Sequence, residues 1–457
     1  IAEVGGEFRL LRILTEVRLN EPIPDTVFAS AERIQVAPQA DSAQTEFWQR
    51  YALVELSPRE VEIYRRMDSI ARQTEPLVHG VQSLLGGTFP LFGRFQRVNG
   101  VQLGVTGTVV LGWLESSAAV TYAFGRSAWE GWAELRGRVG KLFGNSFQLA
   151  ARAFAWTEPV GWDRTYPEWL NSVLAALAHR DYYDWGYREG WSAAATLRRA
   201  KGRLTLEASR FRFQGLPAEV QRSIFLRKPF RENPHADDGH YWVGQIAVQW
   251  GEPTEGVELT VSSHQLRFGV YASAGLGRWQ PYGSRTWQDF WAGLVRFQVE
   301  LPTVSLGGYP PMKLRLWAEL GRGRNAPFPY QFRLRTSSIV GRLGHCVTAP
   351  EGVYGGRYLV AWSLEHTFGD LWWRALGLPT VRGRGLELIL GAAAAQLRDG
   401  VLYRETGRQW YSELFLGIGR IPVPLTELVV ARATLGYGVG PLARGRWGGA
   451  VQLAFGF

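Results

Sequence analysis

The residues best able to hold a metal ion gather in one short segment. His235-Ala236-Asp237-Asp238-Gly239-His240 brings two imidazoles and two carboxylates together. Zinc takes imidazole nitrogens and calcium takes carboxylate oxygens, so either ion could use such groups. The spacing matches no known ligand pattern, however, and no second set of ligands pairs with it. We therefore predict a solvated loop and no metal.

Candidate nucleophiles are poorly placed for catalysis. Ser262, Ser263 and His264 stand together, but adjacent residues of a strand point to opposite faces, so Ser263 and His264 cannot share one. A hydrolase would need a serine, a histidine and an acid that converge. Glu365 and His366 are expected to pack at the inner end of a strand. We predict no catalytic residue, no cofactor and no enzymatic activity.

A larger set of charged residues alternates with apolar ones along segments with the pattern of strands. Both signs occur in neighbouring segments, which favours a ladder of cross-strand ion pairs over a single-sign ring that selects ions. Such side chains either line a solvated or plugged interior or select a solute, and the sequence leaves both open. The residues expected to line the interior are Glu130, Glu134, Arg136, Arg138, Glu207, Glu258, Arg296, Glu300, Lys313, Arg315, Glu319, Arg357, Glu365, Glu387 and Arg432.

The composition excludes several classes of protein. Hydrophobic residues make up 46% of the 457 positions, too many for a disordered chain. No run of about 18 apolar residues could form a transmembrane helix. The formal net charge is +10, yet no dense Lys/Arg run appears, so nucleic acid is not an expected partner. The only cysteine, Cys346 beside His345, excludes a disulfide within the chain and is expected to be inert or buried.

Alternation with a period of two dominates the rest of the chain. From Trp447 to Phe457 the odd positions are mostly large and apolar, and the even positions are small or polar. We interpret the closing Phe455 and Phe457 as a C-terminal barrel signal. The pattern recurs in segments 85–97, 100–112, 116–125, 129–141, 146–156, 188–199, 203–213, 239–250, 257–270, 287–300, 312–322, 353–368, 384–396, 410–420, 427–437 and 446–457.

These segments share an apolar face that no helical layer of matching length could cover. Lipid is the natural cover, and closure into a barrel leaves no unpaired sheet edge within it. We predict an all-β fold: a transmembrane antiparallel β-barrel of about 16 strands over residues 85–457. A large soluble sandwich or propeller is the alternative.

The lengths of the connections indicate which end of the barrel faces which compartment. Connections such as Gly112–Glu115 and Ala200–Gly202 are short, whereas those at 157–187, 214–238, 271–286 and 323–352 are long. Short periplasmic turns and long outer loops are typical of bacterial outer-membrane barrels, so we place the chain in the outer membrane of a Gram-negative bacterium. An aromatic girdle is expected at the outer strand ends, formed by Trp129, Trp191, Trp242, Trp287, Tyr358, Trp410 and Trp447.

Two helices are expected outside the strands. Ser57-Pro58-Arg59-Glu60 is a capping box that predicts a helix over about 58–73, within a periplasmic region at 1–84. An amphipathic helix is expected within Thr165–His179, where it could lie on the outer leaflet, cap the pore, dock a partner or pack on the rim. Ile1 is not a start residue and no signal peptide follows it, so we expect the chain to begin inside a longer or processed protein.

Several short motifs resemble one known family. Bacteroidota outer-membrane proteins of unassigned function join a carboxypeptidase-regulatory-like domain to a C-terminal barrel, and their marks are similar to segments of this chain. The matching segments are Glu46-Phe47-Trp48-Gln49-Arg50-Tyr51, Leu56-Ser57-Pro58-Arg59-Glu60, Tyr64, Asp68-Ser69-Ile70, Arg97–Leu103, Gly356-Arg357-Tyr358, Glu365–Gly369, Leu376–Pro379, Tyr411 and Gly417–Arg420. The opening Asn99-Gly100-Val101-Gln102-Leu103 lacks the family's glutamate, and we expect no regulatory-like domain within these 457 residues.

That barrel is similar in turn to the sixteen-stranded assembly and secretion barrels of the surface-antigen type. Their signature motif is Val-Arg-Gly-Phe/Tyr, in the long loop before strand twelve. Thr380-Val381-Arg382-Gly383 has part of it, but strand parity places this segment in a periplasmic turn. The corresponding loop, 323–352, holds Ser338-Ile339-Val340-Gly341-Arg342 instead. This departure argues against an insertase-like mechanism.

Three functions stay open. The resemblance implies a transport or assembly barrel that handles protein or lipid traffic with outer-membrane or periplasmic partner proteins, and it predicts an interior occluded by loop 323–352 or the N-terminal helix. A passive or solute-selective channel predicts an open interior. A structural subunit of a larger cell-surface complex predicts partners that survive detergent. In each case outer-membrane lipid and lipopolysaccharide are expected to surround the barrel.

Overall fold

The computed structural model describes the chain from Leu91 onward with short gaps, and the chain divides into two units, Ile1–Ser83 and Leu84–Phe457. The predicted region 1–84 and its helix at 58–73 therefore lie outside the described residues. These residues are 91–142, 145–162, 168–220, 222–223, 229–234, 236–251, 266–303, 312–336, 345–378, 386–423 and 426–455.

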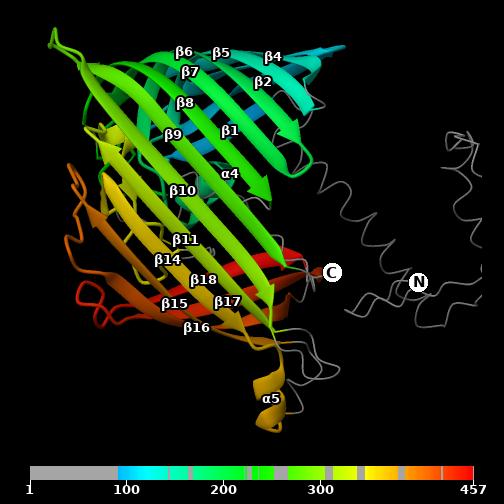
Figure 1. Cartoon of the computed structure of the whole chain (residues 1–457). Helices are drawn as coiled ribbons and strands as arrows, with labels where there is room; N and C mark the ends of the chain where they lie inside the picture. Colours follow the sequence, from blue (N-terminus) through cyan, green and yellow to red (C-terminus); the bar gives the residue numbers. More distant parts are fainter. Residues whose placement is uncertain are drawn as a thin grey trace, which may run out of the picture. The chain divides into compact units, whose positions relative to one another are not determined.

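The second unit is built on one sixteen-stranded antiparallel sheet, in which each strand pairs with the next along the chain (Figure 1). This confirms the predicted all-β fold. The strands of the sheet are β1 Leu91–Gln96, β2 Gly100–Leu111, β3 Leu114–Ala123, β4 Ala128–Leu142, β5 Asn145–Pro159, β6 Trp185–Arg199, β7 Gly202–Gly215, β8 Gly239–Gly251, β9 Arg267–Pro281, β10 Gln288–Pro302, β11 Lys313–Arg324, β14 Tyr358–Thr367, β15 Glu387–Arg398, β16 Tyr411–Val423, β17 Thr426–Gly438 and β18 Trp447–Phe455.

One predicted strand lies in the wrong place. The sequence favoured 257–270, but β9 begins at Arg267 and runs to Pro281. Residues 271–278 alternate among small side chains such as Ala272, Ala274 and Gly275, which weakens the contrast in hydropathy that marks a strand. The outer connection predicted at 271–286 shrinks accordingly to 282–287.

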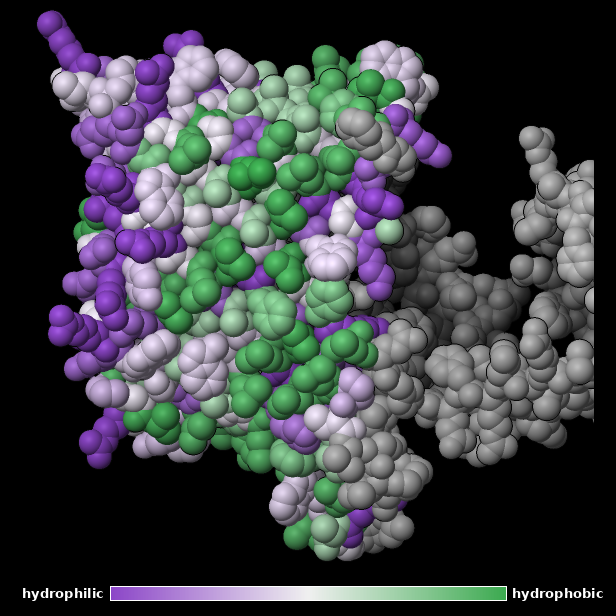
Figure 2. Space-filling view, in the orientation of Figure 1, coloured by the Kyte–Doolittle hydropathy of each residue, from purple (hydrophilic) through white to green (hydrophobic). Residues whose placement is uncertain are grey.

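The outward face of the sheet is apolar. Val109, Leu276 and Trp129 are 57%, 69% and 70% exposed, as alternate residues of a strand must be when their face has no protein cover. Figure 2 shows hydrophobic side chains spread across the visible face, with hydrophilic ones gathered at the margin where the β9–β10 hairpin projects. An apolar face of this extent, on a sheet of this size, is the surface that a β-barrel presents to lipid.

The interior is packed by a long connection that folds back onto the wall. Between β11 and β14 run a short 3-10 helix η1, Phe328–Tyr330, and a two-stranded pair, β12 Phe332–Arg333 and β13 Gly355–Gly356. Phe332 of β12 and Tyr354 of the same connection bury against Trp317 of β11 and Phe415 of β16 in one apolar cluster. The loop predicted to occlude the interior thus lies against the inner wall.

The two ends of the barrel differ in the predicted sense, with two exceptions at the end with the short turns. The β8–β9 connection spans 252–266, because β9 begins later than predicted, and the β14–β15 connection spans 368–386. The β2–β3, β4–β5 and β6–β7 turns are short, whereas the β5–β6, β7–β8 and β11–β14 connections are long. The β5–β6 connection contains helix α4, Glu168–Ala178, and the β14–β15 connection contains helix α5, Leu371–Ala375. The β14–β15 connection belongs to the end with the short turns, and the segment Thr380–Gly383 lies outside the described residues.

The first strand is covered by helix α4. The amide of Phe95 donates to Ser172 Oγ over 3.0 Å, and the amide of Arg97 donates to Asp181 Oδ2 over 3.0 Å. Among the described residues the pairing runs from β1 to β18 without a ladder that joins those two strands. Side chains from the α4 connection therefore satisfy edge groups of β1, a recognised way to protect a sheet edge.

Within the described part of the chain, no helix combines the length and the apolar character needed to cross a membrane.

Candidate functional site

One buried carboxylate holds the outer connections together. Asp184, which precedes β6, accepts hydrogen bonds from Arg97 Nη2 at 2.9 Å, Arg231 Nη1 at 2.5 Å, Arg333 Nη1 at 2.7 Å and Tyr403 OH at 2.6 Å. These donors come from the β1–β2, β7–β8, β11–β14 and β15–β16 connections. We call Arg97, Asp181, Asp184, Arg231, Arg333 and Tyr403 the cap cluster.

The electrostatics of the cap cluster favour its closed arrangement. Burial alone would raise the pKa of Asp184, but the guanidinium groups of Arg231, Arg333 and Arg97 hold it well below its usual range. Arg97 has no exposed surface and also donates to the carbonyl of Tyr183 at 2.6 Å. The charges are therefore compensated only while the connections stay assembled, because each partner lies on a different one.

A neighbouring carboxyl of the cap has a different environment. Glu351 lies 3.8 Å from Arg231 and 3.7 Å from Arg180. Burial raises the pKa of Glu351 to about 7, and the opposing effect of Arg231 is smaller. This carboxyl therefore titrates near neutral pH at the outer mouth.

A second buried carboxylate organises the start of the sheet. Glu130 accepts hydrogen bonds from Asn99 Nδ2 at 3.0 Å, from Gln102 Nε2 at 3.0 Å and from the Thr157 amide at 3.1 Å. Arg126 Nη2 also reaches it, at 2.5 Å. Asn99 and Gln102 belong to the motif that resembles the family's barrel opening, and the structure gives both a buried structural role.

The opposite wall carries a ladder of ion pairs. Arg296 bonds Glu319 at 2.7 Å, and Arg315 bonds Glu300 at 2.9 Å; both pairs are cross-strand partners of β10 and β11. Glu365 extends the ladder, because Arg432 of β17 bonds it through both guanidinium nitrogens. We call the whole set the wall ladder: Arg296, Glu300, Lys313, Arg315, Glu319, Glu365 and Arg432.

Buried acids also fasten the loop 325–357 to the wall. Glu413 of β16 accepts the amides of Val347 and Thr348 at 2.6 and 2.8 Å. Arg335 of the loop pairs with Glu319 of β11 at 3.3 Å. These charge-assisted bonds fix the loop to strands on the same side of the barrel.

A polar cavity of about 460 Å³ lies inside the wall of β5–β8. Glu158 pairs there with Arg152 at 3.1 Å and Arg188 at 3.2 Å, and Trp162 and Tyr330 add aromatic surface from two connections. Charged and aromatic groups in one cavity are suited to a small polar ligand with a carboxylate or hydroxyl groups.

The remaining charges predicted for the interior are scattered. Glu207 and Glu134 line the cavity, and Arg136 pairs with Glu134 and, at 3.2 Å, with Glu115. Arg138 is exposed beside a β-bulge of β4. Two others lie apart from these groups: Arg357 donates to the Ala326 carbonyl, and Glu387 is 3.9 Å from Arg420. Glu258 lies outside the described residues.

The aromatic residues predicted for the girdle lie near the outer ends of their strands. Trp191 and Trp242 contact each other edge to face at 6.1 Å, and Tyr437 joins Trp447 at 4.8 Å. Phe455 is the last residue of β18, and Phe457 lies beyond the described residues. The exposed members are Trp129, Trp191, Trp242, Trp287, Trp410 and Trp447, and Tyr358 is partly exposed.

The groups considered for catalysis or metal binding have structural partners. Asp237 accepts the amide of Phe328 and Asp238 accepts the amide of Gly215. Among the described residues no cluster of His, Cys, Asp and Glu is arranged for a metal ion. His366 Nε2 lies 3.1 Å from Thr303 Oγ1, and Cys346 is buried. Ser262–His264 falls outside the described part of the chain.

Sequence reasoning missed the cap cluster and Glu413. Asp184 stands in Asp181-Tyr182-Tyr183-Asp184-Trp185, a loop segment without periodicity that precedes β6. The only local signal was two acids among aromatics in a long connection. Its partners are up to 219 positions away, so no local pattern could identify them.

No protein-family model and no curated protein matches the chain. Solved structures similar to it include CdiB from Acinetobacter baumannii, 10% identical, with a TM-score of 0.35 over 79% of this chain and 57% of that one. BamA from Haemophilus ducreyi lacking POTRA domains 1–3 is 10% identical, with a TM-score of 0.43 over 79% and 69%. OccK2 from Pseudomonas aeruginosa is 13% identical, with a TM-score of 0.33 over 80% and 96%.

These structures are themselves outer-membrane barrels, but such distant likeness carries no argument about role. The assignment of this chain rests on its own sheet, its exposed apolar face and the unequal length of its connections. The chain is an outer-membrane β-barrel.

Proposed function

We propose that this barrel is a transport or assembly component that is closed at its outer mouth and handles protein or lipid traffic with partner proteins. The observation that carries the proposal is the convergence of four connections on Asp184 of a fifth. A permanently open pore has no need of such a network. A barrel that opens only when a partner or cargo displaces its loops does.

Contacts across the interior support closure. Trp162, from the β5–β6 connection, bonds the Tyr330 carbonyl through its indole nitrogen at 3.0 Å. Its own carbonyl accepts from Arg296 of β10 at 3.2 Å. Trp162 thus links its own connection both to the β11–β14 connection and to strand β10 of the wall. The described parts of the loop 323–352, which the transport hypothesis expects to occlude the interior, are fastened to the inner wall, and this placement supports the proposal.

A solute-selective channel is the second candidate, and the cavity beside Glu158 favours it. Arg152, Arg188 and Tyr330 could bind an anionic or hydroxylated solute within the barrel. Either role is non-catalytic, and we propose that the protein is not an enzyme. The motifs at Arg97–Leu103 and Gly356–Tyr358 support a further proposal, kinship with the Bacteroidota barrel family.

Conductance of the full chain in a planar lipid bilayer tests closure. The intact protein should be silent or open rarely. Asp184→Asn leaves several buried guanidinium groups without their carboxylate, so we expect its open probability to rise by roughly tenfold or more. Glu189→Gln removes an exposed ion pair with Arg212 on the lipid-facing side of the sheet, and it is the matched control. Steady large openings of the intact protein would overturn the closed barrel and leave the channel.

A further inference from the structure

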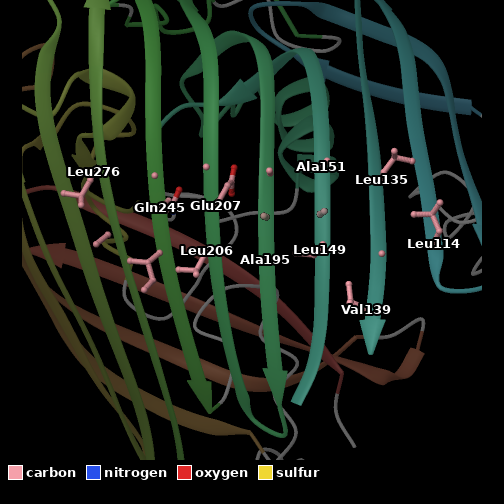
Figure 3. A pocket seen from close by; sticks show the side chains of 18 of the residues that line it. Leu114, Leu135, Val139, Leu149, Ala151, Ala195, Leu206, Glu207, Gln245 and Leu276 are labelled. Atoms are coloured by element: carbon pink, nitrogen blue, oxygen red, sulfur yellow. The ribbon is translucent and has the colours of Figure 1, made fainter. Parts of the chain in front are cut away.

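The outward, lipid-facing side of the sheet has a hollow of about 830 Å³ over β4–β9 (Figure 3). Its floor is a row of small residues that pair in register: Ala151 with Ala193, Ala193 with Ala208, and Ala208 with Gly244. The neighbouring side chains Leu149, Leu206 and Ile246 are larger, so the row lies below them. A depression across several strands follows from the pairing.

Exposed aliphatic residues bound this hollow. Leu206 and Ile246 face each other across β7 and β8, two register positions further from the outer end than the floor pair Ala208–Gly244. Leu135 and Leu276 continue the floor row at its two ends. The bounding side chains Leu135, Leu149, Leu206, Ile246 and Leu276 are all exposed. The hollow therefore has the shape and polarity to accept hydrocarbon chains.

A row of alternating aromatic and cationic residues borders the hollow toward the outer end. Trp191 pairs in register with Arg210, Arg210 with Trp242, and Trp242 with Arg278. The guanidinium of Arg210 lies 4.9 Å from the ring centre of Trp242, and that of Arg278 lies 5.1 Å from Trp287. These rings hold the two cations at the interfacial level.

The surrounding charges leave Arg210 available to an anion. Arg212, two register positions nearer the outer end, already pairs with Glu189 at 2.6 Å. Arg278 has Asp289 as its cross-strand neighbour. Within the described residues Arg210 forms no ion pair, and its guanidinium contacts the Trp242 ring. A guanidinium presented in this way suits a phosphate, which it can bind through two parallel hydrogen bonds.

We propose that this surface binds a phosphorylated, multiply acylated glycolipid of the outer leaflet, the lipid portion of lipopolysaccharide. Its phosphate lies on Arg210, between Trp191 and Trp242, and its acyl chains lie in the hollow. The end with the long connections faces outward, which places the cationic row in the outer leaflet. The inference rests on the outer-membrane fold and not on the proposed traffic role.

Native mass spectrometry of the delipidated full chain, titrated with purified bis-phosphorylated lipid A, tests the headgroup. We expect Arg210→Gln to weaken binding by about tenfold, the equivalent of one lost charge-assisted hydrogen bond. Arg322 is an exposed arginine on a different strand, β11, so Arg322→Gln is the charge-matched control and should bind lipid A normally. Dephosphorylated lipid A should bind the intact protein as weakly as lipid A binds the variant. Equal binding of both lipids, or of Arg210→Gln and the control, would overturn the site.

Filling the hollow tests the acyl chains independently. A Cβ at Gly244 would meet open space, so Gly244→Leu should fold and occupy the floor. Gly107→Leu on β2 is the matched control, because Gly107 also faces open space. We expect Gly244→Leu to weaken lipid A binding severalfold while Gly107→Leu leaves it unchanged. An unchanged affinity of Gly244→Leu would show that the acyl chains lie elsewhere and would refute the proposal.

Discussion

The cap cluster and the wall ladder are both networks of buried arginines and acids, yet they join different things. Most ladder pairs, such as Arg315–Glu300, link adjacent strands through residues whose register is fixed by backbone pairing. Arg432 of β17 reaches Glu365 of β14 across two intervening strands, but both residues still belong to the sheet. Cap contacts such as Arg333–Asp184 and Tyr403–Asp184 link connections 149 and 219 positions apart. The ladder therefore belongs to the sheet, whereas the cap can come apart while the sheet remains.

This difference has a physical origin. Each strand pair is held by a full row of backbone hydrogen bonds, so the ladder adds to an interface that already exists. The connections have no such row between them, and buried charge pairs supply much of their attachment. Removal of one partner from either cluster leaves buried charge, but only in the cap should the consequence be local opening.

The largest expected effect is on the wall. Glu365 compensates Arg432 and Arg315, so Glu365→Gln should lower the free energy of unfolding of the barrel by about 3 kcal/mol. Urea unfolding followed by tryptophan fluorescence measures it. Asp184→Asn should instead leave this transition nearly in place while its loops become sensitive to protease. Equal losses of barrel stability in both variants would erase the distinction between cap and wall.

A smaller effect is expected from pH at the cap. The pKa of Glu351 is about 7 in the folded protein against an ordinary value of 4.5. The closed cap therefore binds a proton that the opened cap releases, so closure weakens as pH rises from about 4.5 to 7. Arg231, Arg180, Arg97 and Asp181 are the charged neighbours.

Open probability in a bilayer at pH 5 and pH 8 measures this dependence. We expect more openings at pH 8 in the intact protein. Glu351→Gln keeps a neutral side chain at both values and should remove the difference. If the open probability of Glu351→Gln still differed between pH 5 and pH 8, the pH dependence would belong to another group.

The smallest effect is expected on the outer face. Glu189 and Arg212 form a close pair, but their side chains are 48% and 47% exposed. Exposed pairs contribute about 0–1 kcal/mol, so Glu189→Gln should hardly change unfolding or conductance. If Glu189→Gln lowered the free energy of unfolding as much as Glu365→Gln, burial would not explain why the two ion pairs differ.

The strands were predictable because their signal is local. A period of two along β2 or β18 needs only the residues of that strand, and it follows from a sheet with lipid on one face and protein on the other. The prediction failed at β9, where small residues stand on both faces. Small residues of β9 such as Ala274 also line the hollow on the lipid-facing side, together with Gly244. The missed strand and the proposed lipid site therefore share one cause, the small size of these side chains.

The sequence by itself determined the membrane-facing pattern, the parity of the connections and the charged character of the inner face. It could not determine which charges meet. Glu300 and Arg315 meet because strand register brings them together, and Asp184 meets Arg97 and Tyr403 because the folded connections converge at one mouth. Alternation is a property of neighbouring residues, whereas closure depends on contacts between distant ones, and only the tertiary structure decides these.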